Sequence, residues 1–426
     1  MISIIKYDEK NTEKIFARGA SVKDVSGVVS EIIKDVRENG DKALKAYCEK
    51  FDGATLTDFA VSEEELREAV AHTPRKFLRI LKQAAKNIEI FHTRQKRKGF
   101  ALKKKNGTVI GQKITPIEKV GLYVPGGTAA YPSTVLMNAI PARIAGSGRI
   151  VIVTPPNKEG KINPAILAAA YVAGVTEIYK VGGAQAIAAL AYGTETIPKV
   201  DKIVGPGNAF VAEAKKQVFG AVNIDMIAGP SEILVVADGK SNAEFVAADL
   251  LSQAEHDKMA SAVLVTNSEE LAVKVRAEIE KQLPALSRYE IARASIDGNG
   301  KIIIAKNIEQ AIEISNALAP EHLELCVDEP FKYLDMVKNA GSVFLGRFCP
   351  EALGDYFAGP NHTLPTVGTA RFSSPLSVDD FIKKTQFTYY TKEALDKVAG
   401  KIARFAEKEG LSAHAKSATV RSENYE

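Results

Sequence analysis

The spacing of apolar positions changes character near residue 118. Before that point, apolar residues recur every three or four positions among Lys and Glu over residues 22–51 and 62–95, which predicts amphipathic helices. Ser62 precedes three glutamates and is the predicted N-cap of the second helical stretch. No residue pattern in this region points to a particular chemistry, so we interpret it as scaffold.

From residue 118 onward, short apolar runs alternate with helical patterns. The predicted strands are 120–124, 150–153, 177–181 and 200–204, and the helices between and after them are 132–145, 164–173, 184–191 and a last one reaching 218. Each strand is followed by a turn rich in Gly or Pro. Repeated βα units of this kind predict a parallel sheet, with ligands bound at the carboxyl ends of its strands.

A second set of similar units follows, without a residue-level repeat of the first. Its predicted strands are 233–236, 262–265, 302–305, 323–327 and 343–345, and its helices are 243–254, 268–281, 308–317 and 330–338. Past residue 375 the pattern is irregular and then helical over 392–408. This last segment has too little apolar surface to fold by itself, so we expect it to pack on the body or on a second subunit.

Composition narrows the class of protein. The 426 residues are 46% apolar and 25% charged with a net charge of +4, typical of a globular protein and unsuited to a polyanionic partner. The basic run 94–105 is interpreted as a solvated face, with nucleic-acid binding as the rival. Three widely spaced cysteines argue against a disulfide framework and a thiolate zinc site. The early charges at the N-terminus and the short apolar run 165–175 predict a cytoplasmic protein with no membrane segment.

A metal-capable pair closes the helical run 243–254. Gln253 and His256 are three residues apart and would share one helix face. Glutamine is an unusual zinc ligand, so a solvated helix end is the competing interpretation. The remaining candidate ligands lie late in the chain, in polar or turn-rich surroundings: His322, Asp355, His362 and His414. Together these residues predict a mixed nitrogen and oxygen zinc site.

The catalytic candidates are Glu321 and His322, in a turn between an alanine-rich helix and a strand. An imidazole with a pKa of ~6.5 suits a general base, and burial can raise a glutamate into the same range. A capping glutamate beside a histidine bonded to backbone is the alternative. The chain has no G-x-G-x-x-G, since Gly205-Pro206-Gly207 lacks the third glycine. The glycine turns therefore fit a phosphate or dinucleotide site and simple tight βα connections equally well.

Seven motifs, read together, resemble histidinol dehydrogenases. They occur in the family's order from the N-terminal helices to the segment around His414: VGLYVPGG at 120–127, GGAQAIA at 182–188, GPGN at 205–208, AGPSE at 228–232, SQAEH at 252–256, APEHL at 319–323, and GPNH at 359–362 followed by LPT. The resemblance covers nearly the whole chain.

This resemblance implies an NAD-dependent zinc enzyme that oxidises L-histidinol through L-histidinaldehyde to L-histidine, the last steps of histidine biosynthesis, and reduces two NAD. One Zn²⁺ per subunit is expected on Gln253, His256, Asp355 and His414. His322 matches the general base and Glu321 the residue that activates water. The remaining implied contacts are to substrate from Ser231, His362 and Glu409, besides His322 and the zinc ligands, and to NAD from Tyr123, Gln185 and Asn208.

The resemblance also implies a fold of two α/β lobes with incomplete Rossmann-like parallel sheets flanked by helices. The expected parts are an N-terminal extension 1–17, a larger lobe 18–122 with 233–376 that carries the metal and catalytic residues, a smaller NAD lobe 123–232, and a C-terminal arm 377–426. In the family the arm crosses to the partner of a homodimer, which would place Glu409 and His414 in the other subunit's site.

Two enzymatic rivals remain at this stage. A zinc hydrolase would use Glu321 on a metal-bound water without nicotinamide, although such enzymes keep an open metal position and four protein ligands are available here. A relative that oxidises another amino alcohol would retain the zinc ligands and the base. The presence of Ser231, His362 and Glu409 favours histidinol itself.

Overall fold

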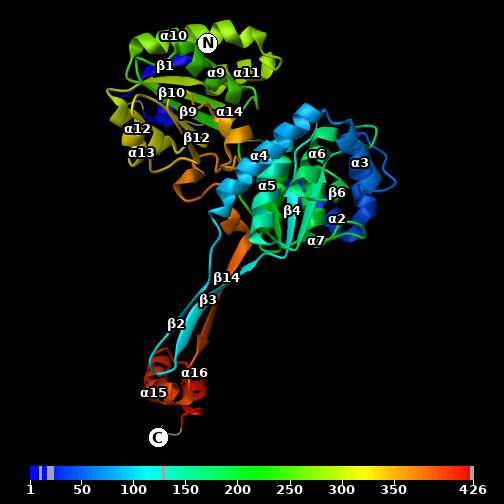
Figure 1. The fold of residues 1–426 in the computed structure, drawn as a ribbon, viewed down its shortest axis with the longest axis vertical. Coiled ribbons are helices and arrows are strands. Elements are labelled where there is room, and N and C mark those ends of the chain that lie inside the picture. The colour runs from blue at the N-terminus through cyan, green and yellow to red at the C-terminus, as the bar shows by residue number, and fades with distance from the viewer. Residues whose placement is uncertain (9–11, 17–23, 127–129, 423–426) are drawn as a thin grey trace. The chain divides into compact units, whose positions relative to one another are not determined.

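A computed structural model describes residues 1–8, 12–16, 24–126 and 130–422. It divides into two compact units (Figure 1). The first comprises Met1–Gln95 and Glu118–Phe381, and the second comprises Lys96–Ile117 and Ile382–Glu426. The predicted turn residue Gly127 and the first two residues of the predicted helix 22–51 lie outside the described residues.

The helices before residue 95 follow the predicted pattern with two interruptions. After the short α1 (Thr12–Phe16), α2 (Ser26–Tyr47) kinks at Gly40 and continues into the π-helical η2 (Cys48–Asp52). The predicted helix over 62–95 is two helices, α3 (Glu63–His72) and α4 (Arg75–Thr93), because Pro74 separates them. The predicted cap is confirmed: Ser62 accepts from the Glu65 backbone, and the Glu65 side chain accepts from the Ser62 backbone.

A five-stranded parallel sheet forms one lobe of the first unit. Its strand order is β6-β5-β4-β7-β8. The strands are β4 (Lys119–Tyr123), β5 (Arg149–Thr154), β6 (Glu177–Lys180), β7 (Lys202–Val204) and β8 (Asn223–Ile224), and the helices between them are α5 (Pro132–Ala145), α6 (Pro164–Ala173), α7 (Gly183–Tyr192) and α8 (Ala209–Val218). The predicted bounds of α5 and α6 are confirmed. Pro132 and Pro164 stand at the first helical position, where the missing N–H has no intrahelical partner to lose.

The helices before residue 95 pack with this five-stranded lobe. Helix α2 contacts α7 and α8, whereas α3 contacts α6 and α4 contacts α5. Apolar residues of α2, such as Val29 and Leu44, share one core with Val151 and Val153 of β5. The resemblance grouped residues 18–122 with 233–376. Helices α2, α3 and α4 contact elements within 123–232, and α4 also contacts residues 354–358, so the lobe boundaries remain a prediction.

A six-stranded parallel sheet forms the other lobe, in the order β1-β11-β10-β9-β12-β13. Its strands are β1 (Ser3–Lys6), β9 (Glu232–Ala237), β10 (Ser261–Thr266), β11 (Lys301–Ile304), β12 (His322–Cys326) and β13 (Ser342–Leu345). The predicted N-terminal extension thus supplies an edge strand. Both faces are covered, since Val235 packs towards α9 (Ala243–Ala254) and α10 (Glu269–Gln282), while Val236 packs towards α12 (Ile308–Leu318).

Other elements of this lobe were not predicted or differ from the prediction. Helix α11 (Tyr289–Asn299) was not predicted, and α13 (Phe331–Leu334) is shorter than the predicted 330–338. After β13 come the one-turn helix α14 (Glu351–Leu353) and the π-helical η4 (Gly354–Ala358). The predicted α/β class with two parallel sheets flanked by helices is confirmed.

The second unit is an antiparallel sheet and two helices. The strands β2 (Phe100–Lys103), β3 (Val109–Pro116) and β14 (Ile382–Tyr389) pair in the order β14-β3-β2, and α15 (Lys392–Lys408) packs on α16 (Ser412–Thr419). The prediction of irregular chain after residue 375 was wrong for β14. Its side chains are mostly exposed, so no alternation of apolar and polar residues marks it. Among the described residues, no helix is both long and apolar enough to cross a membrane.

Candidate active site and metal centre

A cavity of about 1400 Å³ in the first unit is lined by both lobes. The five-stranded lobe contributes residues that follow β4 and β7, among them Gly126 and Asn208. The six-stranded lobe contributes Ser231, Gln253 and His322, from strand starts and the end of α9. Small-molecule pockets usually measure ~300–1,000 Å³, so this one is large enough for two ligands side by side.

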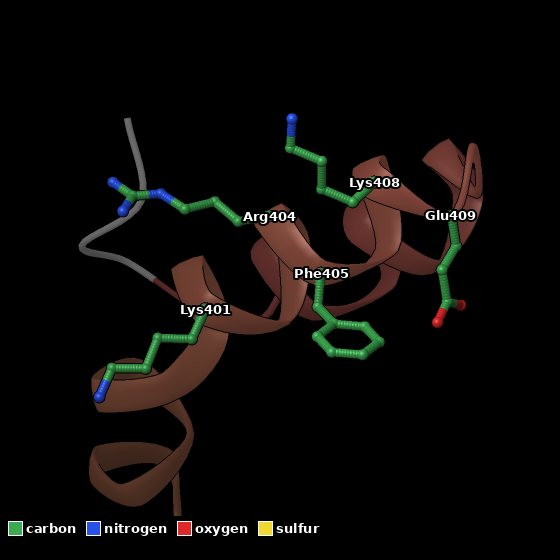
Figure 2. Close-up of a pocket in the computed structure, with 5 residues that line it drawn as sticks. All are labelled: Lys401, Arg404, Phe405, Lys408 and Glu409. Atoms are coloured by element: carbon green, nitrogen blue, oxygen red, sulfur yellow. The ribbon is translucent and has the colours of Figure 1, made fainter.

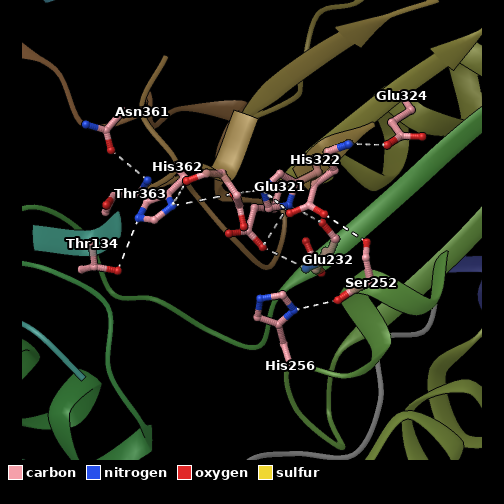
Figure 3. Close-up of polar contacts among 12 residues, drawn as sticks. Thr134, Glu232, Ser252, His256, Glu321, His322, Glu324, Asn361, His362 and Thr363 are labelled. Carbon is pink, nitrogen blue, oxygen red and sulfur yellow. Dashed lines mark hydrogen bonds and ion pairs between the residues drawn. The ribbon is translucent and has the colours of Figure 1, made fainter. Parts of the chain in front are cut away.

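Glu232 anchors both predicted catalytic side chains. Its backbone N–H donates to Oε2 of Glu321 over 2.9 Å, and its carbonyl oxygen lies 3.0 Å from Nδ1 of His322. These contacts lie at the first residues of the neighbouring strands β9 and β12 (Figure 3). Both catalytic side chains are buried, so their rotamers are fixed before any substrate binds.

Three histidines of the cavity are held in the same way. Nδ1 of His256 lies 3.0 Å from the Ser252 carbonyl, that of His322 3.0 Å from Glu232, and that of His362 3.1 Å from Asp355. A carbonyl oxygen only accepts, so each Nδ1 carries a hydrogen, and Nε2 keeps its lone pair when the imidazole is neutral. Such second-shell bonds orient histidines for metal binding or proton transfer.

Three of the four predicted zinc ligands line this cavity: Gln253, His256 and Asp355. Oε1 of Gln253 is buried without a hydrogen-bond partner among the described residues, which a cation would satisfy. With the available Nε2 of His256 and the Asp355 carboxylate, the donor set fits zinc. His414 lies in the second unit on α16, where it is exposed.

The segment that carries Asp355 and His362 is fixed by helices of the other lobe. Asn87 of α4 donates to the carbonyl oxygen of Phe357 over 2.8 Å. Asn361 donates to the carbonyl oxygen of Met137 in α5 over 2.6 Å. Nothing in the sequence pattern singled out Asn87, because a lone asparagine in an amphipathic helix is ordinary.

Negative charge surrounds His322. Its ring nitrogens lie 3.7 Å from Glu321, 3.8 Å from Glu351 and 3.7 Å from Asp355. Burial opposes the charged imidazolium, but the carboxylates, Glu321 first, outweigh it and raise the pKa of His322 to about 10.

The carboxyl groups respond to the same surroundings. Burial raises the pKa of Glu321 to about 7, and burial together with the charge of Asp355 raises that of Glu351 to about 8. Burial also opposes ionisation of Asp355, yet the imidazoles of His322, 3.7 Å away, and His362, 3.8 Å away, hold the pKa of Asp355 well below its usual range. Asp355 is therefore the ionised group of the set, as a metal ligand should be.

Glu351 is a site residue that the sequence analysis missed. Its Oε1 is buried without a hydrogen-bond partner in the described part of the chain, and its Oε2 accepts from Ser252 Oγ over 3.1 Å. Its backbone N–H donates to Glu324 over 2.7 Å. One residue thereby joins α9, which carries Gln253, to β12, which carries His322. A glutamate four residues before Asp355 was the only available signal.

The predicted substrate contacts are divided between the two units. Ser231 and His362 line the cavity, and Nε2 of His362 lies 3.4 Å from Oγ1 of Thr134. Glu409 lies in the second unit at the end of α15. There it lines a shallow hollow with four other residues (Figure 2): Lys401, Arg404, Phe405 and Lys408.

The predicted NAD contacts differ in accessibility. Asn208 lines the cavity and caps α8, its side chain accepting from the backbone of Phe210 and Val211. Tyr123 and Gln185 are 4% and 2% exposed. The Tyr123 hydroxyl accepts from the Gly183 backbone at the start of α7. A Cβ at Gly183 would lie 2.6 Å from Oε1 of Gln185, so both side chains lie close to the glycine turn Gly182-Gly183.

Cys326 does not have the surroundings of a reactive thiol. It is 5% exposed, and burial followed by the charge of Glu324 raises its pKa, so the thiolate is disfavoured. We therefore interpret Cys326 as a structural thiol.

Comparisons with known proteins agree with the motif pattern. The family model described as histidinol dehydrogenase matches residues 17–422. A histidinol dehydrogenase from Clostridium acetobutylicum is 55% identical over 426 residues, 99% of each chain, and one from Bacillus cereus is 59% identical over 398 residues, 93% of this chain and 92% of its own. The crystal structure of histidinol dehydrogenase from Elizabethkingia anophelis superposes with a TM-score of 0.94 at 43% identity, covering 99% of this chain and 98% of that one. A match of this extent establishes that the chain belongs to the histidinol dehydrogenase family.

Proposed function

We propose that this protein oxidises L-histidinol through L-histidinaldehyde to L-histidine, with two hydride transfers to NAD and one Zn²⁺ in the site. The observation that carries the proposal is the cavity in which Glu321 and His322 lie together with Gln253, His256 and Asp355. The first two supply a base and a carboxylate, and the last three supply metal ligands. A shared cavity allows one bound substrate to meet both sets.

Bound NAD would supply the hydride acceptor, and bound zinc would hold the substrate through its imidazole and amino groups. In the first oxidation, Nε2 of His322 takes the hydroxyl proton of histidinol as the hydride leaves its carbon. The Nδ1 contact with the Glu232 carbonyl keeps that lone pair directed at the substrate. The products of this step are the aldehyde, NADH and a proton on His322.

In the second oxidation, Glu321 removes a proton from the water that adds to the aldehyde. The burial that raises the pKa of Glu321 to about 7 makes it a stronger base than an exposed glutamate. After His322 has released its first proton to solvent, the hydrated aldehyde loses its hydride to a second NAD and its hydroxyl proton to His322. The carboxylate of histidine forms without a covalent enzyme intermediate.

A histidine must be neutral before it can accept a proton, and the nearby carboxylates favour protonated His322. One of these carboxylates is Asp355, a proposed zinc ligand. A divalent cation held there would offset its charge and with it part of the upward pKa shift. We therefore expect His322 to be a better base in the zinc-loaded protein.

We assign the cofactor to the glycine turns of the five-stranded lobe. Asn208 is the proposed direct contact, and Tyr123 and Gln185 are proposed to shape the turn at the start of α7. The absence of G-x-G-x-x-G does not contradict this assignment, because the peptide groups after a parallel strand and before a helix N-terminus suit a phosphate without that fingerprint.

We propose that the second unit completes the site of a partner in a homodimer. Its helices expose apolar side chains that a monomer would leave in water: Phe405 is 70% exposed and Leu411 is 42% exposed. Glu409 and His414 lie close to them in sequence. Docking on a second copy would bury these apolar groups and supply the fourth zinc ligand.

The test is NADH formation from L-histidinol, counted per substrate consumed, with zinc-loaded protein, chelated protein and the His322→Ala variant. We expect two NADH per histidinol, lost on chelation and in the variant. Turnover of an ester or amide substrate without nicotinamide reduction would support a zinc hydrolase. No reaction with histidinol by zinc-loaded protein would assign the site to another amino alcohol.

Gel filtration with zinc analysis tests the shared site. We expect a dimer that loses zinc when His414→Ala removes the proposed fourth ligand. A monomer carrying one tightly bound zinc would contradict the shared site and leave the other parts of the proposal standing.

A further inference from the structure

A buried ion pair contacts the first residue of the proposed cofactor turn, Gly205–Asn208. Lys215 of α8 contacts Asp225, and the two side chains are 2% and 0% exposed. A buried ion pair contributes little net stability relative to apolar side chains of the same size, because both charges lose their water. The pair therefore calls for a role other than general stabilisation.

Both partners also bind one residue of the turn. Nζ of Lys215 donates to the carbonyl oxygen of Gly205 over 3.0 Å, and Oδ2 of Asp225 accepts from the Gly205 N–H over 2.8 Å. The remaining oxygen of Asp225 accepts from the Met226 N–H over 2.6 Å. Gly205 is thus held at both of its peptide groups by one pair of charges.

The conformation held at this position is unusual. Gly205 has φ +116°, and a Cβ there would lie 2.1 Å from the carbonyl oxygen of Tyr123. The ion pair therefore fixes a backbone shape that brings β7 and β4 into close approach. The next residues, Pro206, Gly207 and Asn208, line the cavity.

The turn lies where the strand order of the five-stranded sheet reverses. Strands β5 and β6 extend from β4 in one direction, and β7 and β8 extend in the other. Open α/β sheets bind ligands at this switch point, beyond the carboxyl ends of the strands. A turn with only part of the usual glycine pattern needs another means of holding its shape.

We infer that Lys215 and Asp225 are positioning residues for the dinucleotide: they act through Gly205 to hold Pro206, Gly207 and Asn208 against the nicotinamide cofactor. This inference rests on the proposed function of the turn. The pair does not touch the cofactor. Its loss should weaken cofactor binding and leave histidinol binding unchanged, because the histidinol groups belong to the other lobe.

The test compares Lys215→Met and Asp225→Asn with wild type. We expect the KM for NAD and the NADH dissociation constant, measured by NADH fluorescence, to rise at least tenfold. The KM for histidinol and the zinc content should stay within twofold of wild type. Asp225→Asn keeps the side-chain volume and one acceptor for the Gly205 N–H, so it is the variant to use if Lys215→Met fails to fold.

Lys202→Met is the matched control. Lys202 begins β7, is 5% exposed in its side chain and pairs with Asp380 over 3.6 Å. The variant therefore removes a buried lysine at the start of β7, whereas Gly205 follows the end of that strand. We expect this variant to lose stability without a change in the KM for NAD. An unchanged NADH dissociation constant in Asp225→Asn, or an equal rise in Lys202→Met, would overturn the inference. Failure of wild-type protein to bind NADH would instead refute the proposed function.

Discussion

The two parallel sheets of the first unit share one strand order, yet they line the cavity with opposite ends of their strands. Counted from the first βα unit of each lobe, both run 3-2-1-4-5, and β1 adds a sixth strand beside β11. The five-stranded lobe lines the cavity with turns after β4 and β7, at the carboxyl ends of the strands. The six-stranded lobe lines it with the starts of β9, β10, β11 and β12.

This difference follows from the backbone groups found at each end of the strands. A turn that leads from a strand into a helix presents backbone N–H groups and the positive end of the helix dipole, which suit a phosphate. The amino ends of the strands lie beside helix C-termini, whose carbonyl groups favour cations. Gln253 and His256 lie at the C-terminus of α9, and the partly negative surroundings there suit zinc. In the proposed function, the cofactor therefore binds at the carboxyl ends of one sheet's strands, and metal binding and proton transfer take place at the amino ends of the other's.

The largest expected effects are at the catalytic pair of the six-stranded lobe. His322→Ala should slow both oxidations by ~10²–10⁴-fold, since it removes the general base of each. Glu321→Gln should slow the aldehyde step by a similar factor and leave the alcohol step nearly intact, because water activation is needed only there. Stopped-flow NADH formation from histidinol and from histidinaldehyde separates the two steps. Equal losses of both steps in Glu321→Gln would contradict the assigned roles.

The next effect is at Glu351, which connects three elements of that lobe. Glu351→Ala should lower zinc affinity or turnover by ~10–100-fold, as expected for a group that supports metal ligands from the second shell. Glu351→Gln keeps an acceptor for Ser252 and should retain more of both. Zinc titration with a competing chelator measures the loss. Glu89→Gln, on exposed α4 surface in an ion pair with Arg143, is a suitable control. If both glutamates gave the same small effect, Glu351 would have no special role.

A smaller effect is expected from pH. Glu321 acts as a base only when ionised, and its pKa is raised to about 7, so the ionised fraction falls as pH falls through 7. The aldehyde step should therefore lose ~10-fold in rate per unit below pH 6. An exposed glutamate would show this loss only below ~pH 4. A flat profile for kcat of the aldehyde step from pH 5 to 8 would rule out Glu321 as its base.

The smallest effect is expected at the proposed cofactor turn after β7 in the five-stranded lobe. A Cβ at Gly207 would lie 2.4 Å from a methyl carbon of Val211, so Gly207→Ala should shift the turn and raise the KM for NAD several-fold, as expected where a glycine allows close approach of backbone to ligand. The KM for histidinol should not change. Gly27→Ala, within α2 and with nothing near its added Cβ, is the control and should stabilise the fold by ~0.5–1 kcal/mol. A rise in both KM values would show that the proposed NAD and histidinol sites are not independent.

Local signals determined most of the first unit's elements. The βα units from 118 onward, the starts of α5 and α6, and the Ser62 cap follow from apolar runs, prolines and a capping box, all of which act over a few residues. The catalytic and metal residues were indicated by residue type and by the family motifs. These features could be predicted from the sequence because each depends on residues that are neighbours along the chain.

Tertiary structure decided what depends on distant partners. Asn87 holds the Asp355 segment from 270 residues away, and Lys215 reaches Gly205 only after β7 and α8 have folded together. The strands β2, β3 and β14 have exposed faces, and their existence depends on pairing between segments far apart in the chain. The sequence by itself determined most helices and strands of the two lobes and the residue types on which the proposed chemistry rests. Only packing decided which ends of the strands line the cavity, because that depends on how the two lobes meet and no short stretch of residues records it.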